Sequence, residues 1–121
     1  MKLVIKLQLI NKREFIIKKS RFIGLYYQVN DINQIDEILN NVKKEYKKAH
    51  HFPYAYKIGN NIKKSDDKEP SNTAGMPIYN IIIKNNLDNV LIIIVRYYGG
   101  IKLGVGPLAR AYLNTANSLL N

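Results

Sequence analysis

A buried strand that runs into a glycine-rich loop and then into a helix constrains this chain more than any other feature. Residues 89–95 carry no charge, and seven residues are too few to cross a membrane. Such an apolar run is typical of a central strand that is buried on both faces. Four of the seven glycines follow between positions 99 and 106, and Pro107 suits the first turn of a helix. Free backbone N–H groups and a partial positive charge are therefore expected beside this loop, where an anion can bind.

Two well-known phosphate-binding loops do not fit this segment. A P-loop ends in Gly-Lys-Ser or Gly-Lys-Thr, whereas Lys102 is followed by Leu103. Residues 104–109 match the dinucleotide pattern G-x-G-x-x-A, but the residues after them contain neither an acidic ribose partner nor a second strand. Two interpretations stay open. The glycines either allow a tight turn over two tyrosines, or they form a site for an anion or a partner.

Length and composition predict one folded domain. The 121 residues are enough for one core, and we expect a single domain over residues 1–121 with no second domain. The absence of cysteine excludes disulfide bonds and thiolate chemistry. Apolar and polar residues alternate over residues 3–10, which indicates a strand rather than a signal peptide. We therefore expect a cytoplasmic protein that does not enter a membrane.

Positive charge is concentrated in the first half of the chain. The net charge is +10, and residues 1–64 hold 14 Lys and Arg against 5 acidic residues, whereas residues 65–121 hold 5 against 4. The candidates for phosphate contacts are Lys18, Lys19 and Arg21 in one cluster and Lys43, Lys44, Lys47 and Lys48 in another. The second cluster also has a structural explanation, because lysines near the end of a helix complement its dipole. Contact with RNA or the ribosome and an ordinary solvated surface both remain possible interpretations.

Hydrophobic periodicity predicts an α+β fold of two layers with the element order ββαβαβα. We expect a hairpin of residues 3–10 and 14–29 that turns at 11–13, a helix over 32–48, a strand over 52–58, and then a polar loop. A second helix is expected to follow Thr73 as its cap and to stop near residues 85–86, before the buried strand and the final helix.

The polar loop over residues 65–77 breaks the basic trend with three carboxylates, those of Asp66, Asp67 and Glu69. Carboxylates this close repel one another, so they normally need a cation or a helix N-terminus nearby. We expect the loop to meet the third strand and the glycine-rich loop, with Arg96 or Arg110 within ion-pairing reach of one carboxylate.

A sharper alternative adds His50 and His51 to the three carboxylates. Together they would offer a site for a hard metal ion or for acid–base chemistry. The spacing matches no metal-binding motif, and we therefore expect no metal or other cofactor.

Four motifs stand in order along the chain: Ser20–Gly24, Ala49–Gly59, Asp66–Gly75 and Arg96–Gly104. Together they resemble the Impact/YigZ family over roughly residues 18–114. The resemblance implies the Impact N-terminal domain fold, which is similar to the second domain of a small-subunit ribosomal protein and to domain IV of elongation factor G, with a left-handed β-α-β crossover. It also implies one cleft, the motif cleft, formed by His50, Tyr54, Asp66, Asp67, Glu69, Thr73, Arg96, Gly99, Gly100, Lys102, Gly104 and Arg110.

The chain departs from the family pattern at several positions. The family has glycine where this chain has Lys68 and Asn72, tyrosine-phenylalanine where it has Tyr97-Tyr98, and often glycine at Pro107. Bacterial members commonly continue into a small ferredoxin-like domain, and eukaryotic Impact carries an extra domain in front. Eukaryotic Impact restrains a stress kinase that acts on translation initiation, and without that extra domain its partner binding is not carried over whole.

The leading hypothesis is a non-catalytic binding module linked to translation or its regulation. Its partner would be RNA, the ribosome or a translation-regulatory protein, and the basic first half of the chain points the same way. The resemblance to ribosomal and elongation-factor domains is a fold-level analogy. The alternative is a small hydrolase or phosphate-handling enzyme with a cleft between residues 65–75 and 99–106. An evident nucleophile and a metal-ligand spacing are both missing from that cleft, which weighs against the enzyme.

Overall fold

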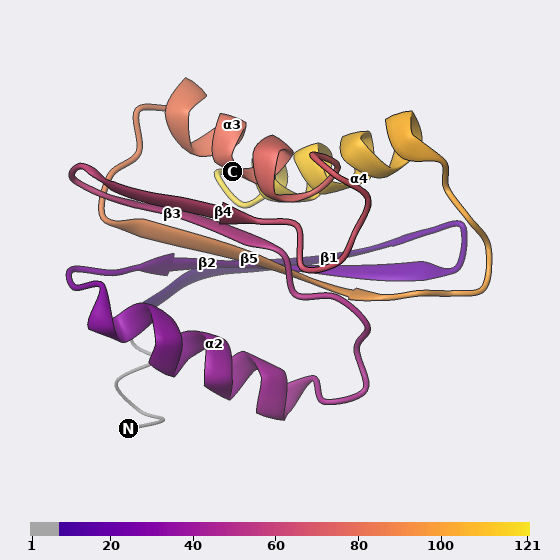
Figure 1. Cartoon of the computed structure of the whole chain (residues 1–121), viewed down its shortest axis with the longest axis horizontal. Helices are drawn as coiled ribbons and strands as arrows, with labels where there is room; N and C mark the ends of the chain where they lie inside the picture. The colour runs from indigo at the N-terminus through magenta and orange to yellow at the C-terminus, as the bar shows by residue number, and fades with distance from the viewer. Residues whose placement is uncertain (1–7) are drawn as a thin grey trace.

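A five-stranded antiparallel sheet carries three helices in the computed structural model, which describes residues 8–121 (Figure 1). The strand order is β1-β2-β5-β3-β4. Along the chain the elements are β1 (Leu9–Ile17), β2 (Ser20–Gln28), α2 (Asn33–Glu45), β3 (Tyr54–Ile58), β4 (Asn61–Ser65), α3 (Gly75–Lys84), β5 (Val90–Tyr97) and α4 (Val105–Ser118).

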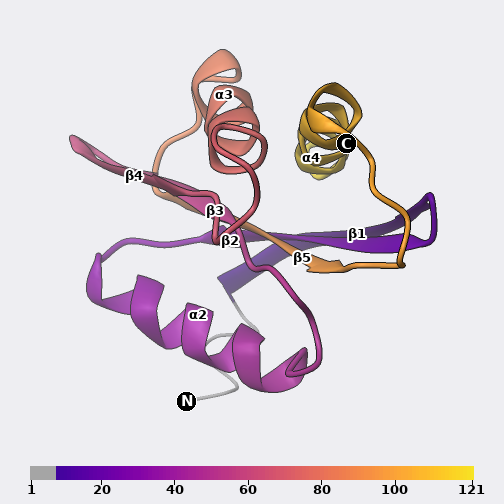
Figure 2. The same cartoon turned by 45° about the vertical axis from the view of Figure 1, so that its right-hand side comes forward.

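Both faces of the sheet are covered, because helix α2 lies on one face while α3 and α4 lie side by side on the other (Figures 1 and 2). Strand β5 is the middle strand and contributes side chains to the hydrophobic cores on both faces of the sheet. Its Leu91, Ile93 and Val95 pack with α2, whereas Val90, Ile92 and Ile94 pack with α3 and α4. Burial on both faces explains why this strand is an unbroken apolar run rather than an alternating one.

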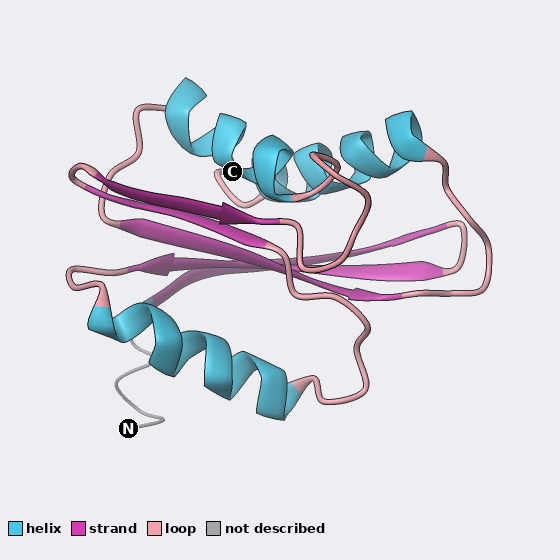
Figure 3. Cartoon of the chain, viewed as in Figure 1, coloured by secondary structure: helices cyan, strands magenta, loops and turns pink. Residues whose placement is uncertain are grey.

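The two β-α-β connections of the sheet have opposite hands. Strands β2 and β3 are parallel to each other with β5 between them, and β4 and β5 are parallel with β3 between them. The chain moves across the sheet in opposite directions in the two units, and the strands of the two units also run in opposite directions. Helices α2 and α3 lie on opposite faces, so one crossover must be right-handed and the other left-handed (Figure 3). A left-handed crossover, as the resemblance implied, is therefore part of this fold.

The α+β class and the packing of helices on a sheet are confirmed, and the structure adds strand β4 and a helical layer on each face. Strand β4 pairs with β3 across a turn at Gly59 and Asn60. It was missed because it is an edge strand whose residues are almost all exposed, so its sequence shows no buried face.

The predicted turn of the first hairpin is wrong. Strand β1 continues through residues 11–13, and the chain turns instead at Lys18 and Lys19, with Ile17 opposite Ser20. Asn11 lies at a register shift within the strand and donates through its side chain to the carbonyl of Leu119 at 2.9 Å. The predicted strand residues 3–7 lie outside the described residues.

Candidate functional site

Arg96 stands at the end of the middle strand and is the centre of the site. Its backbone exchanges hydrogen bonds with His51, which joins the end of β5 to the segment before β3. The guanidinium group is buried, with 6% of the side chain exposed, and its Nη1 donates to Glu69 Oε2 at 2.7 Å. Its Nη2 donates to the hydroxyl of Ser20 at 3.2 Å. The ion pair expected between Arg96 or Arg110 and the polar loop over residues 65–77, called the acidic loop below, is thus formed by Arg96 and Glu69.

The Glu69 carboxylate ties the acidic loop to the last helix as well. The same oxygen that accepts from Arg96 also accepts a hydrogen bond from the hydroxyl of Tyr112 in α4. Burial, reinforced by the neighbouring Glu69 carboxylate, raises the pKa of Tyr112 far above its usual range. The Arg96 guanidinium also lies 5.3 Å from the centre of the Phe22 ring, and Phe22 meets Tyr112 edge to face. Residues from β2, the acidic loop, β5 and α4 therefore form one buried network.

Asp66, rather than Thr73, caps helix α3. Its two carboxylate oxygens accept from the backbone N–H groups of Asn72 at 2.9 Å, Ala74 at 3.1 Å and Gly75 at 2.8 Å. The capping role expected for Thr73 is wrong, because its hydroxyl donates to the carbonyl of Pro70 at 2.6 Å. A carboxylate at a helix N-terminus satisfies free donors and complements the helix dipole.

Asp67 holds the segment that carries His51. Its carboxylate accepts the N–H of Phe52 at 2.6 Å, and its backbone carbonyl lies 2.8 Å from His51 Nδ1. A carbonyl can only accept, so Nδ1 carries a proton. The other ring nitrogen, Nε2, lies 3.5 Å from Glu69 Oε1.

His51, which lies beside Glu69, is thus closer to the network than the predicted His50. The exposed His50 ring accepts the N–H of Tyr98 at 2.9 Å and lies edge to face with the Tyr98 ring. Only the register of the backbone pairing with Arg96 distinguishes the two histidines, and the sequence alone does not give it.

The glycine-rich loop is closely packed against the turn between β1 and β2. A side chain on Gly99 would lie 2.0 Å from the backbone oxygen of Lys19, so only glycine fits there. The N–H of Gly99 donates to the Ser20 hydroxyl at 3.3 Å, and Gly100 has a φ of 91°. The loop ends at Gly104, which precedes α4. The packing interpretation therefore holds for Gly99.

Tyr54 and Arg110, both predicted members of the motif cleft, take no part in the buried network. Tyr54 packs on the α2 face of the sheet, where its ring stacks on that of Tyr56. Arg110 is exposed on α4 and forms no ion pair with the described residues of the acidic loop.

A pocket of about 380 Å³, the motif pocket, opens between the acidic loop and the start of α4. Its polar lining consists of His51, Glu69, Arg96 and Lys102. Its apolar lining consists of Pro70, Tyr98, Leu103, Val105 and Leu108, with Gly104 between them.

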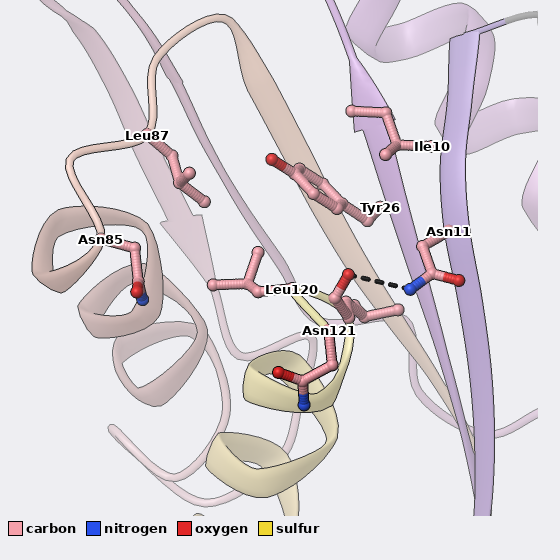
Figure 4. A pocket seen from close by; sticks show the side chains of 8 residues that line it. Ile10, Asn11, Tyr26, Asn85, Leu87, Leu120 and Asn121 are labelled. Atoms are coloured by element: carbon pink, nitrogen blue, oxygen red, sulfur yellow. Dashed lines mark hydrogen bonds between the residues drawn. The ribbon is translucent and has the colours of Figure 1, made fainter.

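A larger cavity, of about 630 Å³, lies toward the start of β5 and is lined by residues such as Tyr26, Leu87 and Leu120 (Figure 4). None of the motif-cleft residues lines it.

The predicted phosphate-contact residues differ in how free their charges are. Arg21 is paired with Glu14 at 2.5 Å and lies over the ring of Tyr97. Lys18 and Lys19 are exposed at the hairpin turn. The four lysines at residues 43–48 are also exposed, and three of them line a shallow groove with Asn40.

No group of three or more potential metal ligands gathers anywhere within residues 8–121. In the same part of the chain, no helix has the length and apolar character that crossing a membrane requires.

Comparisons with known proteins agree with the four motifs. The family model of the Impact N-terminal domain matches residues 18–120. IMPACT family member YvyE of Bacillus subtilis (strain 168) is 40% identical over 113 residues, which are 91% of this chain and 52% of that protein. IMPACT family member YigZ of Escherichia coli (strain K12) is 34% identical over 109 residues, which are 86% of this chain and 53% of that protein. The chain thus spans about half the length of these curated relatives.

Two solved structures share the fold. One, described as the crystal structure of a hypothetical protein, has a TM-score of 0.88 and 32% identity, and covers 91% of this chain and 56% of its own. The two-domain translational regulator Yih1 has a TM-score of 0.53 and 18% identity, and covers 93% of this chain and 45% of its own.

Proposed function

Because this chain belongs to the Impact N-terminal domain family, we propose that it is a non-catalytic binding module that acts in translation or its regulation. Its partner in this proposal is the ribosome, contacted in the cytoplasm through ribosomal RNA. The description of Yih1, which shares the fold, as a translational regulator supports the link to translation. The observation that carries the choice of partner is a row of free lysines at the end of helix α2 and in the turn that follows it.

The lysine row consists of Lys43, Lys44, Lys47 and Lys48, all of them exposed. None of the four forms an ion pair with any residue between positions 8 and 121. Lys43 and Lys44 lie in the last turn of α2, whose buried stripe fixes the helix on the sheet. Lys47 and Lys48 follow in the next turn, beside the buried Tyr46. Unpaired lysines on a segment that is anchored in the core are suited to replacing the counterions of an RNA phosphate backbone.

The acidic loop supports a binding module more than a hydrolase. The Asp66 carboxylate accepts hydrogen bonds from backbone N–H groups at the N-terminus of α3, and the Asp67 carboxylate accepts one from the N–H of Phe52. The Glu69 carboxylate accepts hydrogen bonds from Arg96 and Tyr112. A general acid or base must reach a reacting group, and all three carboxylates already accept hydrogen bonds from the protein itself. Through these hydrogen bonds the acidic loop connects the neighbouring strands and helices to one another.

Co-sedimentation with purified ribosomes at low salt tests this proposal. The variant replaces Lys43, Lys44, Lys47 and Lys48 with glutamine. A matched control replaces Lys57, Lys63, Lys64 and Lys84 with glutamine, which gives the same net charge from lysines outside the row. We expect the wild type and the control to pellet with ribosomes and the row variant to stay largely in the supernatant.

Equal pelleting of the row variant and the wild type would exclude the lysine row as the surface that binds the ribosome. If the wild type fails to pellet even at low salt, the ribosome is not the partner, and a translation-regulatory protein replaces it.

A further inference from the structure

The motif pocket is a concave site that the lysine row does not explain. Three of the four sequence motifs contribute to its lining, through His51, Glu69 and the segment from Arg96 to Gly104. Its volume of about 380 Å³ falls in the range in which proteins hold small molecules. It is lined by apolar walls with a few polar groups, which is the usual composition of a ligand pocket.

The apolar part of the pocket is incompletely covered. Tyr98 is 40% exposed and Val105 is 64% exposed, and both line the pocket beside the buried Leu103 and Leu108. Neighbouring Ile101 is also 40% exposed. Apolar side chains that gather at a concave surface are stabilised when a ligand removes them from water. A flat apolar group would cover these walls.

The polar part of the pocket carries an excess of positive charge. The negative charge of Glu69 is balanced by Arg96, whereas the ammonium group of Lys102 has no ion-pair partner within residues 8–121. The buried Arg96 side chain lines the pocket, and its Nε donates to no partner in this part of the chain. Helix α4 begins at the same place, with neither a side-chain cap nor an acidic residue in its first turn. An anionic group is therefore the charge that this site accepts.

We propose that the motif pocket binds a small organic anion, a phosphate or carboxylate attached to a flat apolar body. The anionic group pairs with Lys102 near the start of α4, and the apolar body covers Leu103, Val105 and Leu108. This site is separate from the lysine row, so the two proposals succeed or fail independently.

Titration of the full chain with phenyl phosphate, followed by amide resonances in two-dimensional NMR spectra, tests this site. We expect saturable shifts concentrated at residues 96–108. Benzyl alcohol lacks the anion and inorganic phosphate lacks the apolar body, so each should bind at least about tenfold more weakly, because each forfeits one of the two contributions.

Two variants locate the binding groups. Lys102→Gln removes the free charge and should weaken phenyl phosphate about tenfold, as expected for a charge-assisted hydrogen bond. Val105→Trp places a large ring at the exposed wall, where folding tolerates it, and should abolish the shifts. The glutamine variant of the lysine row is the matched control, and its affinity for phenyl phosphate should equal that of the wild type.

Three results would overturn the proposal. They are an unchanged affinity in Lys102→Gln, equal binding of benzyl alcohol and phenyl phosphate, and shifts that lie mainly outside residues 96–108. Spectra that stay dispersed and native-like in each variant show that a loss of binding is not a loss of folding.

Discussion

The two residues at which the acidic loop departs from the family pattern both adopt a left-handed backbone. Lys68 has a φ of 69° and Asn72 a φ of 63°. Glycine adopts this conformation without a steric penalty, whereas a residue with a Cβ atom is strained there. A glycine at either position would therefore relieve strain in the backbone.

Lys68→Gly should therefore stabilise the fold. The left-handed conformation costs a lysine about 1–2 kcal/mol in the folded state. Glycine removes this cost but also makes the unfolded chain more flexible, so the free energy of unfolding should rise by only about 0.5–1 kcal/mol. Urea denaturation measures the gain. Lys68→Ala is the control, because it removes the exposed side chain but keeps the strain, and it should leave the free energy of unfolding nearly unchanged. Equal stabilities of the glycine and alanine variants would contradict this account.

Glu69→Gln should destabilise the fold strongly. The change keeps the shape of the side chain but leaves the buried Arg96 without its counter-charge, which costs about 3–5 kcal/mol. Chemical denaturation of the variant measures this loss. Glu14→Gln breaks an exposed ion pair with Arg21 and should cost less than about 1 kcal/mol. If both changes cost the same, the buried network does not hold the loops together.

Tyr112 should make the fold sensitive to alkali. Its pKa is raised in the folded state by burial and by Glu69, whereas in the unfolded chain it titrates near 10. The contribution of Tyr112 to the free energy of unfolding is complete below pH 10. Above pH 10 it falls by about 1.4 kcal/mol per pH unit, because only the unfolded chain loses the phenol proton. Unfolding free energies measured from pH 9 to 11 should fall less steeply in Tyr112→Phe. Parallel curves for the two proteins would exclude the effect.

At the scale of elements, the hairpin of β1 and β2 turns on two lysines in an unfavourable conformation. Lys18 and Lys19 both have positive φ, at 46° and 65°, in a two-residue turn that normally favours Asn-Gly. Replacement of both by Asn-Gly should raise stability by about 1 kcal/mol, which thermal denaturation can follow. The double alanine variant is the control, and a midpoint for Asn-Gly no higher than that of double alanine would contradict the prediction.

These turns and caps mark the limit of what the sequence could predict. The apolar run of β5 was identified because burial on both faces leaves no polar position, and the helical stripe of α2 because burial on one face imposes a period on the sequence. The turn at Lys18 and Lys19 lacks the Asn-Gly that marks a hairpin turn, and the exposed strand β4 lacks a buried apolar face, so the sequence predicted neither. Asp66 caps a helix that begins nine residues later, which no local capping pattern describes. Charge predicted that Arg96 or Arg110 would pair with one carboxylate of the acidic loop, but which two residues pair and the nearness of His51 to Glu69 depend on the fold.

At the scale of the whole molecule, one sheet separates two surfaces with different properties. Helix α2 covers one face and the lysine row lies at its C-terminal end, while the buried network and the motif pocket draw on residues of the loops and of α4. The side chains of the lysine row are exposed and none of them lines the motif pocket, so replacing them leaves the residues of the pocket in place. The proposed ribosome binding and the proposed small-anion binding can therefore be tested one at a time.

The salt dependence of ribosome binding tests the central claim most directly. If the lysine row replaces RNA counterions, the logarithm of the binding constant falls linearly with the logarithm of salt concentration. Replacement of Lys43, Lys44, Lys47 and Lys48 by glutamine should reduce the slope by about one unit for each phosphate that the protein no longer neutralises, up to about four. The matched glutamine control at Lys57, Lys63, Lys64 and Lys84 should keep the slope of the wild type. An identical slope in the row variant and the wild type would contradict the claim.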